Sequence, residues 1–311
     1  MLSRRSVRIK VMQLLYSKDR DDSLNDRDLF NSYKHGINKS YELFLFSIYV
    51  LTRITENAEK DLEKRNSKHL PSDYDKSFTD KVHTNDLIQN VVNNKSLQKK
   101  FKSLGFSDMV NEDYTRKIYE AFAKSDHYKN YIADGNTRQD HIELLLELYR
   151  FCRQNEFFNE TLEDAYYNWL DDKSLVVGAI KKYLKSLPSP DNESFNNFFP
   201  EDETVKDFGQ NLLEKSIKNR QELLNYIIPV LENWDHERLA VVDTILLRMA
   251  LCEMLHFPTI PGKVTLNEYV DLAKNYSTAK SKEFINGILD KLMKDLDSKG
   301  KLIKEGRGLQ E

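Results

Sequence analysis

The stretch from Leu239 to Leu255, "LAVVDTILLRMALCEML", is the most apolar segment of this 311-residue chain. Three charged residues interrupt it, namely Asp243, Arg248 and Glu253. A membrane-spanning helix of about 20 residues carries few or no charges. The segment therefore predicts a buried helix in the core of a folded domain, and we expect no membrane partner.

Two further helices are predicted on the C-terminal side of this core helix. The segment "FPTIPG" at 257–262 ends the core helix, because neither of its prolines fits a helix interior. A short helix is then expected over Thr265–Tyr276, and Ser281 is expected to cap a final helix. Gly287 inside the final helix costs about 1 kcal/mol relative to alanine, which predicts the close approach of another backbone. The polar residues 298–311 predict a frayed tail.

The composition favours a helical fold for the whole chain. Only ten glycines and seven prolines occur among the 311 residues, whereas these two residue types usually make up roughly 12% of a protein. An all-β sandwich or barrel needs such turn residues at short intervals. No G-x-G-x-x-G or G-x-x-x-x-G-K-[ST] loop occurs, so we expect no phosphate-cradling loop and no bound cofactor. The predicted fold class is all-α.

Charge is unevenly distributed along the chain. The 47 basic and 50 acidic side chains leave a formal net charge of −3, which by itself predicts neither a nucleic-acid nor a membrane partner. Residues 1–18, in contrast, contain basic residues and no acidic one. These basic residues are Arg4, Arg5, Arg8, Lys10 and Lys18. A binding surface for an anion is therefore expected at the N-terminus, if anywhere.

The basic residues lie at the start of a predicted helix, Ser3–Lys18, with Ser3 as its N-cap. Cations are unfavourable there, because the helix macrodipole is positive at its start. Guanidinium groups and free backbone amides at a helix start suit phosphate groups. The predicted phosphate-binding residues are Arg4, Arg5, Arg8 and Lys10. Gln13 and Tyr16 provide an amide for base edges and a ring for stacking, as in the recognition of single-stranded RNA. An ordinary solvated helix start explains the charge equally well.

A second basic cluster precedes the final predicted helix. Lys280 and Lys282 flank Ser281, and Phe284 follows within one turn. Ammonium groups and backbone amides meet again at one helix start, which makes these residues candidates for RNA binding. A plain helix cap is the more common explanation of such a sequence taken alone. Two basic helix starts in one chain favour a nucleic-acid partner modestly.

No sequence motif indicates catalysis. The seven histidines are scattered, with no H-E-x-x-H motif, no short His/Cys ligand spacing and no G-x-S-x-G elbow. We therefore expect neither a catalytic site nor a bound metal. Cys152 and Cys252 form no C-x-x-C pair, and arginines interrupt any apolar leader at the N-terminus. A reduced, cytoplasmic location is expected.

Two segments of the chain are similar to each other. "NWLDDKSLVVGAIKKYL" from Asn168 and "NWDHERLAVVDTILLRM" from Asn233 each place a tryptophan before acidic residues and an aliphatic helix. A degenerate repeat and a chance match between two amphipathic hairpins explain this equally well. We expect Trp169 and Trp234 to be core anchors, with the acidic residues after them at helix starts. The best linker candidate, Leu187 to Glu203, separates the two segments.

The two ends of the chain carry a specific combination of motifs. The C-terminal motifs are K-V-x-x-N-E at 263–268, L-A-K at 272–274 and F-I-N-G-I-L-D-K at 284–291, all following "NWDHERLAVVDTILLRMALCEML" from Asn233. The N-terminal motif is "RRSVRIKVMQLLY" from Arg4. Together these residues resemble the NusB family of transcription antitermination factors. The resemblance covers residues 1–20 and 205–295.

The resemblance implies an all-helical fold of two small bundles and a non-catalytic role in transcription. Family members bind the boxA segment of nascent ribosomal RNA together with the small-subunit ribosomal protein that doubles as NusE, and other Nus factors and RNA polymerase are then indirect partners. The implied RNA-binding residues of the arginine-rich helix are Arg4, Arg5, Arg8, Gln13 and Tyr16. Phe284 is similar to a position near the family's RNA path, and Asp243 to an acidic position that faces the ribosomal protein.

The chain also departs from the family's pattern. Typical members have about half its length, and the acidic residue that some relatives carry before the Ser-x-x-Phe element is Lys280 here. We therefore expect four parts. They are an arginine-rich helix at 1–20, an inserted helical region at 21–203, a C-terminal NusB-like domain at 204–297 and a polar tail at 298–311.

Two other functions remain open from the sequence. NusB-like RNA-binding modules also occur in ribosomal RNA cytosine methyltransferases, which append a catalytic domain with Gly-rich loops. The chain ends at Glu311, soon after Lys291, so we expect no such domain. The other alternative is a helical scaffold that binds only protein, with the inserted region as its working surface.

Overall fold

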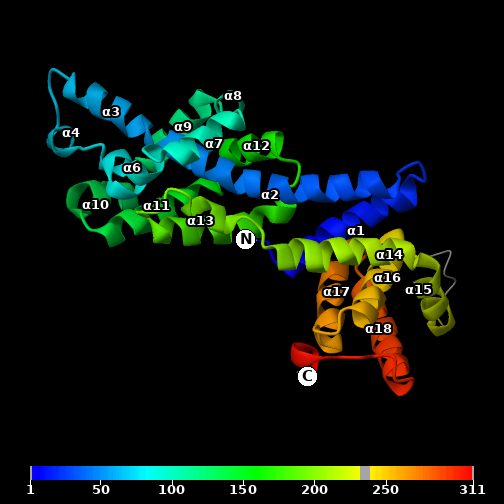
Figure 1. The fold of residues 1–311 in the computed structure, drawn as a ribbon. Helices are drawn as coiled ribbons and strands as arrows, with labels where there is room; N and C mark the ends of the chain where they lie inside the picture. The colour runs from blue at the N-terminus through cyan, green and yellow to red at the C-terminus, as the bar shows by residue number, and fades with distance from the viewer. Residues whose placement is uncertain (1, 232–238, 310–311) are drawn as a thin grey trace. The chain divides into compact units, whose positions relative to one another are not determined.

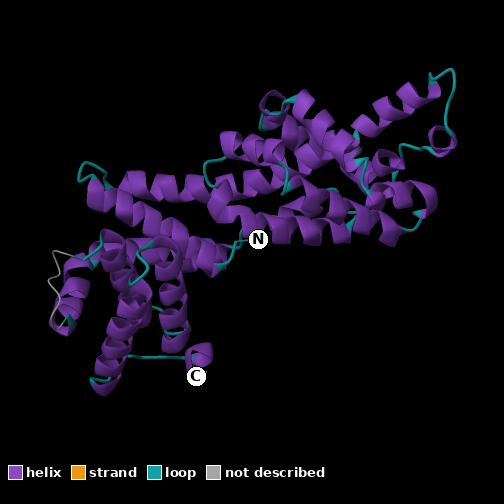
Figure 2. Ribbon diagram, turned by 180° about the vertical axis from the view of Figure 1, so that it is seen from behind, coloured by secondary structure: helices purple, strands orange, loops and turns teal. Residues whose placement is uncertain are grey.

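The computed structural model describes residues 2–231 and 239–309, and these ranges contain helices and loops but no strand (Figure 2). The all-α prediction is confirmed. The chain forms two compact units: an inner unit of residues 38–200, and a terminal unit of Leu2–Ile37 with Glu201–Glu311. One division lies inside helix α2 (Asp26–Thr55), and the other lies at Pro200, within the segment predicted as a linker. The boundaries expected at residues 20 and 203 separate residues that resemble the family from inserted residues, whereas the division described here separates compact units. The expected boundaries therefore stay a prediction.

The inner unit consists of short helices around an aromatic core. After the second part of α2 its elements are α3 (Asn57–Asn66), α4 (Asp73–Ser77), α5 (Lys81–Thr84), α6 (Asp86–Val92), α7 (Lys95–Ser103), α8 (Phe106–Met109), α9 (Glu112–Phe122), α10 (Asp126–Asp134), α11 (Arg138–Cys152), α12 (Glu156–Ala165), α13 (Trp169–Ser186) and the 3-10 turn η1 (Ser194–Phe198). The ring of Phe46 lies 5.1 Å from that of Phe106 and 5.4 Å from that of Tyr166. Trp169 is fully buried, as expected of a core anchor.

Polar N-caps separate these short helices where glycine and proline are scarce. The hydroxyl of Ser72 accepts a hydrogen bond from the Asp75 amide, and the Asp75 carboxylate accepts one from the Ser72 amide. Thr137 and Asp140 form the same reciprocal capping box at the start of α11. Such caps satisfy the free amides of a helix start, so helices begin at defined residues without a glycine.

The terminal unit is built around α16. Its elements are α1 (Arg4–Arg20), the start of α2, the π-helical segment η2 (Glu203–Gln210), α14 (Asn211–Lys218), α15 (Arg220–Ile227), η3 (Ile228–Val230), α16 (Val241–His256), α17 (Gly262–Tyr276), α18 (Ser281–Ser298) and η5 (Gly306–Leu309). Figure 1 shows α16, α17 and α18 side by side, and α16 also packs against α1, α14 and α15. Every residue from Ile245 to Met254 is buried. The prediction of a buried core helix is confirmed.

Three local predictions in the terminal unit are wrong. Ser281 is the first residue of α18 rather than its N-cap, because its hydroxyl donates to the buried carboxylate of Asp243. Gly287 is exposed, and a side chain there would meet nothing within 4 Å, so no backbone approaches it. The tail is held rather than frayed: the Lys304 ammonium donates to the Met254 carbonyl at 3.0 Å, and a Cβ on Gly308 would lie 1.9 Å from the Pro258 carbonyl oxygen.

Trp234, Asp235 and Glu237 lie outside the described residues, so the proposed repeat and its second tryptophan stay untested. Within residues 2–231 and 239–309, no helix combines the length and apolar character that crossing a membrane requires.

Candidate nucleic-acid interface

Helix α1 presents one face to the core and one to solvent. Ser3 caps it as predicted, because its hydroxyl accepts a hydrogen bond from the Ser6 amide at 3.2 Å. The buried face carries Val7, Val11 and Leu15. The outward residues recur at helical spacing: Arg5, Ile9, Gln13, Tyr16 and Arg20. Gln13 and Tyr16 therefore lie on the same face as Arg5, as an RNA-binding helix requires.

The first two arginines have carboxylate partners within the terminal unit. Arg4 pairs with Glu203 of η2 at 3.1 Å, and Arg5 pairs with Asp271 of α17 at 3.2 Å. The exposed fraction of the side chain is 38% for Arg4 and 40% for Arg5. Exposed pairs of this kind contribute roughly 0–1 kcal/mol, so an RNA phosphate can replace the carboxylate at little cost.

Arg8 has a different environment, with only 2% of its surface exposed. Its Nε and Nη2 donate to the two carboxylate oxygens of Glu253 at 2.8 and 2.7 Å, and its Nη1 donates to Glu268 at 3.2 Å. Its guanidinium also lies 5.0 Å from the ring centre of Phe208. The predicted phosphate contact is therefore occupied by an internal bidentate ion pair, and no surface is left for an RNA backbone.

Glu253 completes this buried network. The hydroxyls of Thr265 and Tyr269 donate to its carboxylate at 2.8 and 3.2 Å. Burial alone lowers the pKa of Arg8, but the hydrogen bonds and charge of Glu253 outweigh burial and hold that pKa above its ordinary value. Burial raises the pKa of the Tyr269 hydroxyl well above its usual value. The Arg8 guanidinium therefore stays charged across the physiological pH range. Its hydrogen bonds to Glu253 and Glu268 join α1, α16 and α17.

The remaining predicted residues of α1 also divide into buried and exposed ones. Lys10 is buried, because only 7% of its surface is exposed. Little of this residue is therefore accessible to an RNA on the surface. Tyr16 is 38% exposed, and the guanidinium of Arg20 lies 5.4 Å from its ring centre. An aromatic ring with an arginine beside it is an arrangement on which RNA bases stack.

The second predicted cluster lies at the start of α18. Lys280 and Lys282 are exposed, and Phe284 is half-buried. Arg5 pairs with Asp271, whereas Arg8 pairs with the earlier residue Glu268, so α1 and α17 run in opposite directions where they meet. The start of α1 consequently points along α17 toward the connection that leads to Lys280.

Asp243 is buried rather than presented to a partner. Its two carboxylate oxygens accept hydrogen bonds from the hydroxyls of Ser277 and Ser281 at 2.6 and 2.8 Å. The carboxylate thereby fixes the connection between α17 and α18 against the first turn of α16. Asp243 determines the position of Lys280 and Lys282 through these bonds.

One buried ion pair was not predicted from the sequence. Arg248 of α16 pairs with Asp19 at 2.7 Å, and Arg220 pairs with the same carboxylate at 3.3 Å. Burial lowers the pKa of Arg248. The signal was present, because Arg248 and Glu253 stand out as charges in the most apolar segment, and buried charges need partners. In the part of the chain that the structure describes, no group of three or more His, Cys, Asp or Glu side chains is arranged to hold a metal ion.

The comparisons with known proteins agree with the helical architecture. A profile of the NusB family matches residues 148–294. The chain is 31% identical over 153 residues to the transcription antitermination protein NusB of Thermodesulfovibrio yellowstonii, which covers 49% of this chain and 89% of that protein. This chain belongs to the NusB family.

Other relatives match a shorter region. The identity to the Salinibacter ruber protein of the same name is 40% over 109 residues, covering 35% of this chain and 68% of the relative. The Chloroherpeton thalassium protein is 43% identical over 105 residues, covering 34% of this chain and 50% of the relative. No solved structure matches the chain.

The family match spans a different part of the chain from the sequence resemblance. It begins at residue 148, so it includes α12 and α13, which the sequence resemblance assigned to an inserted region. It includes α16, α17 and most of α18 but not α1. The RNA-binding role expected of α1 therefore rests on its residues and exposed face alone.

Proposed function

We propose that this protein is a non-catalytic, cytoplasmic transcription antitermination factor that binds boxA-type RNA of ribosomal RNA operons. The observation that carries the proposal is membership of the NusB family, with 31% identity across 89% of a relative named for antitermination. The exposed face of α1 supplies side chains suited to single-stranded RNA, which is the second support.

We assign the RNA surface to the outward side chains of α1 and the start of α18. Its residues are Arg4, Arg5, Gln13, Tyr16, Lys280, Lys282 and Phe284. In this assignment Arg4 and Arg5 exchange their carboxylate partners for phosphates, and Tyr16 stacks on a base. Arg8 and Lys10 lie behind this surface, where Arg8 holds α1 to α16 through Glu253.

The proposed protein partner is a ribosomal protein of the NusE type, with other Nus factors and RNA polymerase bound indirectly. Asp243 contributes to that contact by holding the connection between α17 and α18 in place. In this proposal the partner contacts the surface of the connection between α17 and α18, and it does not contact the buried carboxylate of Asp243.

The test is a titration of boxA-type RNA against the full chain, with and without the ribosomal protein. An Arg4→Ala/Arg5→Ala variant is compared with Arg27→Ala/Lys34→Ala, which removes two exposed cations from α2. We expect the α1 variant to bind at least about tenfold more weakly, with a salt slope less steep by about 1.4 because two phosphate contacts are lost. Equal affinities of the two variants would falsify the assignment of the RNA surface.

A further inference from the structure

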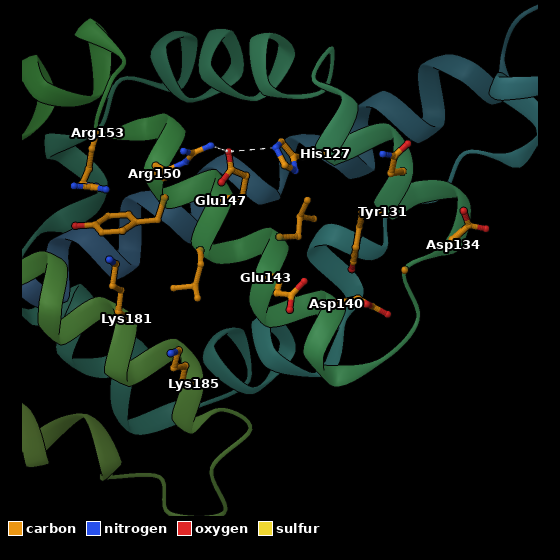
Figure 3. Close-up of a pocket in the computed structure, with 15 residues that line it drawn as sticks. His127, Tyr131, Asp134, Asp140, Glu143, Glu147, Arg150, Arg153, Lys181 and Lys185 are labelled. Atoms are coloured by element: carbon orange, nitrogen blue, oxygen red, sulfur yellow. Dashed lines mark hydrogen bonds and ion pairs between the residues drawn. The ribbon is translucent and has the colours of Figure 1, made fainter.

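A large pocket lies in the inner unit between α10, α11 and α13. Its volume is about 960 Å³, which is at the upper end of the roughly 300–1,000 Å³ of small-molecule sites. Figure 3 shows Arg153, Lys181 and Lys185 on one side of it and Asp134, Asp140 and Glu143 toward the other. The pocket therefore has a basic end and an acidic end.

Three charged side chains at the middle and acidic end, Arg150, Asp140 and Glu143, have hydrogen-bond partners within the unit. Arg150 donates to Glu147 at 2.6 Å. The Asp140 carboxylate caps α11, and one oxygen of Glu143 accepts a hydrogen bond from Gln139 at 2.7 Å. Among the described residues, none donates a hydrogen bond to the second oxygen of Glu143.

The basic end is different. Among the described residues, the charged groups of Arg153, Lys181 and Lys185 have no carboxylate partner, and the buried Nε of Arg153 has no hydrogen-bond acceptor. Lys181 and Lys185 stand one turn apart on α13, where like charges repel. A helix dipole favours a cation near the C-terminal end of the helix. This accounts for Arg153, which follows the last residue of α11, and for Lys185, which lies in the last turn of α13. It does not account for a third cation, Lys181, in the same pocket.

We propose that this pocket binds a nucleoside monophosphate unit, either free or as one nucleotide of an RNA chain. Arg153, Lys181 and Lys185 hold the phosphate, because their groups are the usual phosphate ligands and lack an internal acceptor. Glu143 accepts a hydrogen bond from an exocyclic amino group of the base, as carboxylates do with the cytosine amino group. Uracil has no such group, so the site prefers cytosine to uracil.

The test uses the full chain and calorimetric titration with CMP, UMP, inorganic phosphate and a single-stranded RNA hexamer. Lys181→Gln/Lys185→Gln is compared with Lys129→Gln/Lys182→Gln, which neutralises two exposed lysines on α10 and α13 that do not line the pocket. We expect CMP to bind more tightly than UMP or phosphate. The pocket variant should weaken CMP binding at least about tenfold, and the control variant should change it less than about twofold.

Each other outcome is also decisive. Binding of the hexamer but not of CMP, with the same loss in the pocket variant, identifies an RNA chain as the source of the nucleotide. Phosphate binding as tightly as CMP, equal effects of the two double variants, or no binding of any probe overturns the proposal. Glu143→Gln should abolish the preference for CMP over UMP while the protein keeps its thermal unfolding temperature. The Arg4→Ala/Arg5→Ala variant should leave CMP binding unchanged, so failure of the α1 assignment is distinguishable from failure here.

Discussion

The two units of this protein stabilise their cores in different ways. The inner unit buries many aromatic rings, such as the pair Phe46 and Phe106 and the pair Phe158 and Trp169. The terminal unit buries an aliphatic helix, α16, and places Arg248 and Glu253 inside it with partners on α1. A large-to-small substitution in an apolar core leaves a cavity, whereas removing one partner of a buried ion pair leaves an uncompensated charge. The two units are therefore expected to lose stability for different physical reasons, and only the loss at the ion pair should be recovered by removing the second partner as well.

The largest effect is expected for Arg8→Ala, which breaks this buried network. It leaves the Glu253 carboxylate, which is 0% exposed, without a counter-charge. We expect the free energy of unfolding to fall by about 3–5 kcal/mol, measured by urea denaturation. The control is Arg5→Ala on the same helix, whose exposed pair predicts a change below about 1 kcal/mol. Similar losses for both variants would show that the burial of Arg8 does not matter.

A double substitution sharpens the same comparison. Arg8→Met with Glu253→Leu removes both charges and fills the space with apolar side chains. It should recover most of the stability lost in Arg8→Ala, because the penalty comes from one uncompensated charge. Thr265 and Tyr269 lose their acceptor in this variant, so recovery is expected to be incomplete.

In the inner unit the matched experiment removes apolar volume. Leu145→Ala empties a site that is 0% exposed, and it should lower the free energy of unfolding by about 2–5 kcal/mol. Leu170→Ala is its control, because Leu170 is 72% exposed and should change stability by less than about 0.5 kcal/mol. Equal effects in a thermal unfolding assay would contradict the described core.

Much of the fold was predictable from local sequence. The apolar run of 239–255, the prolines of 257–262 and the N-cap Ser3 each determine their structure through residues close in sequence. Helix α2 was harder to predict. The helical spacing of Phe44, Ile48 and Leu51 predicts one helix over 41–65. In the structure α2 instead runs from Asp26 to Thr55, and a new helix begins at Asn57. Polar residues at 26–40 obscured the early turns, because helical periodicity is visible only where one face is apolar.

The candidate site was less predictable, and for a physical reason. Residues 1–18 carry basic but no acidic side chains. The carboxylate partners of the three arginines lie more than 190 residues away in the sequence, at Glu203, Glu253 and Asp271. Only the tertiary structure brings them to α1. A local count of charge therefore cannot separate Arg5, on the surface, from Arg8, in the core. The apolar periodicity of α1 was the usable signal, since Val7, Val11 and Leu15 place Arg8 beside the buried face.

A smaller effect is expected where a hydroxyl donates to a buried carboxylate. Ser281→Ala removes one hydrogen bond to Asp243 and should cost about 1.5–3 kcal/mol in urea denaturation. Ser298→Ala is the matched control at the other end of α18, where an exposed hydroxyl bonds a backbone carbonyl. The control should change stability by less than about 0.5 kcal/mol. If Ser281→Ala also changes the free energy of unfolding by less than about 0.5 kcal/mol, Asp243 does not hold the connection before α18.

The smallest effects test whether the two units differ only in their cores. Gly178 in α13 and Gly287 in α18 are both exposed, and a Cβ at either position meets nothing within 4 Å. Alanine restricts the unfolded chain and improves helix propensity, so Gly178→Ala and Gly287→Ala should each raise the free energy of unfolding by about 0.5–1 kcal/mol. The gain in unfolding free energy should be the same in both units, because neither position contacts the core. A loss of stability at Gly287 alone, in parallel thermal and urea unfolding, would revive the predicted close approach of another backbone and contradict the open surface described here.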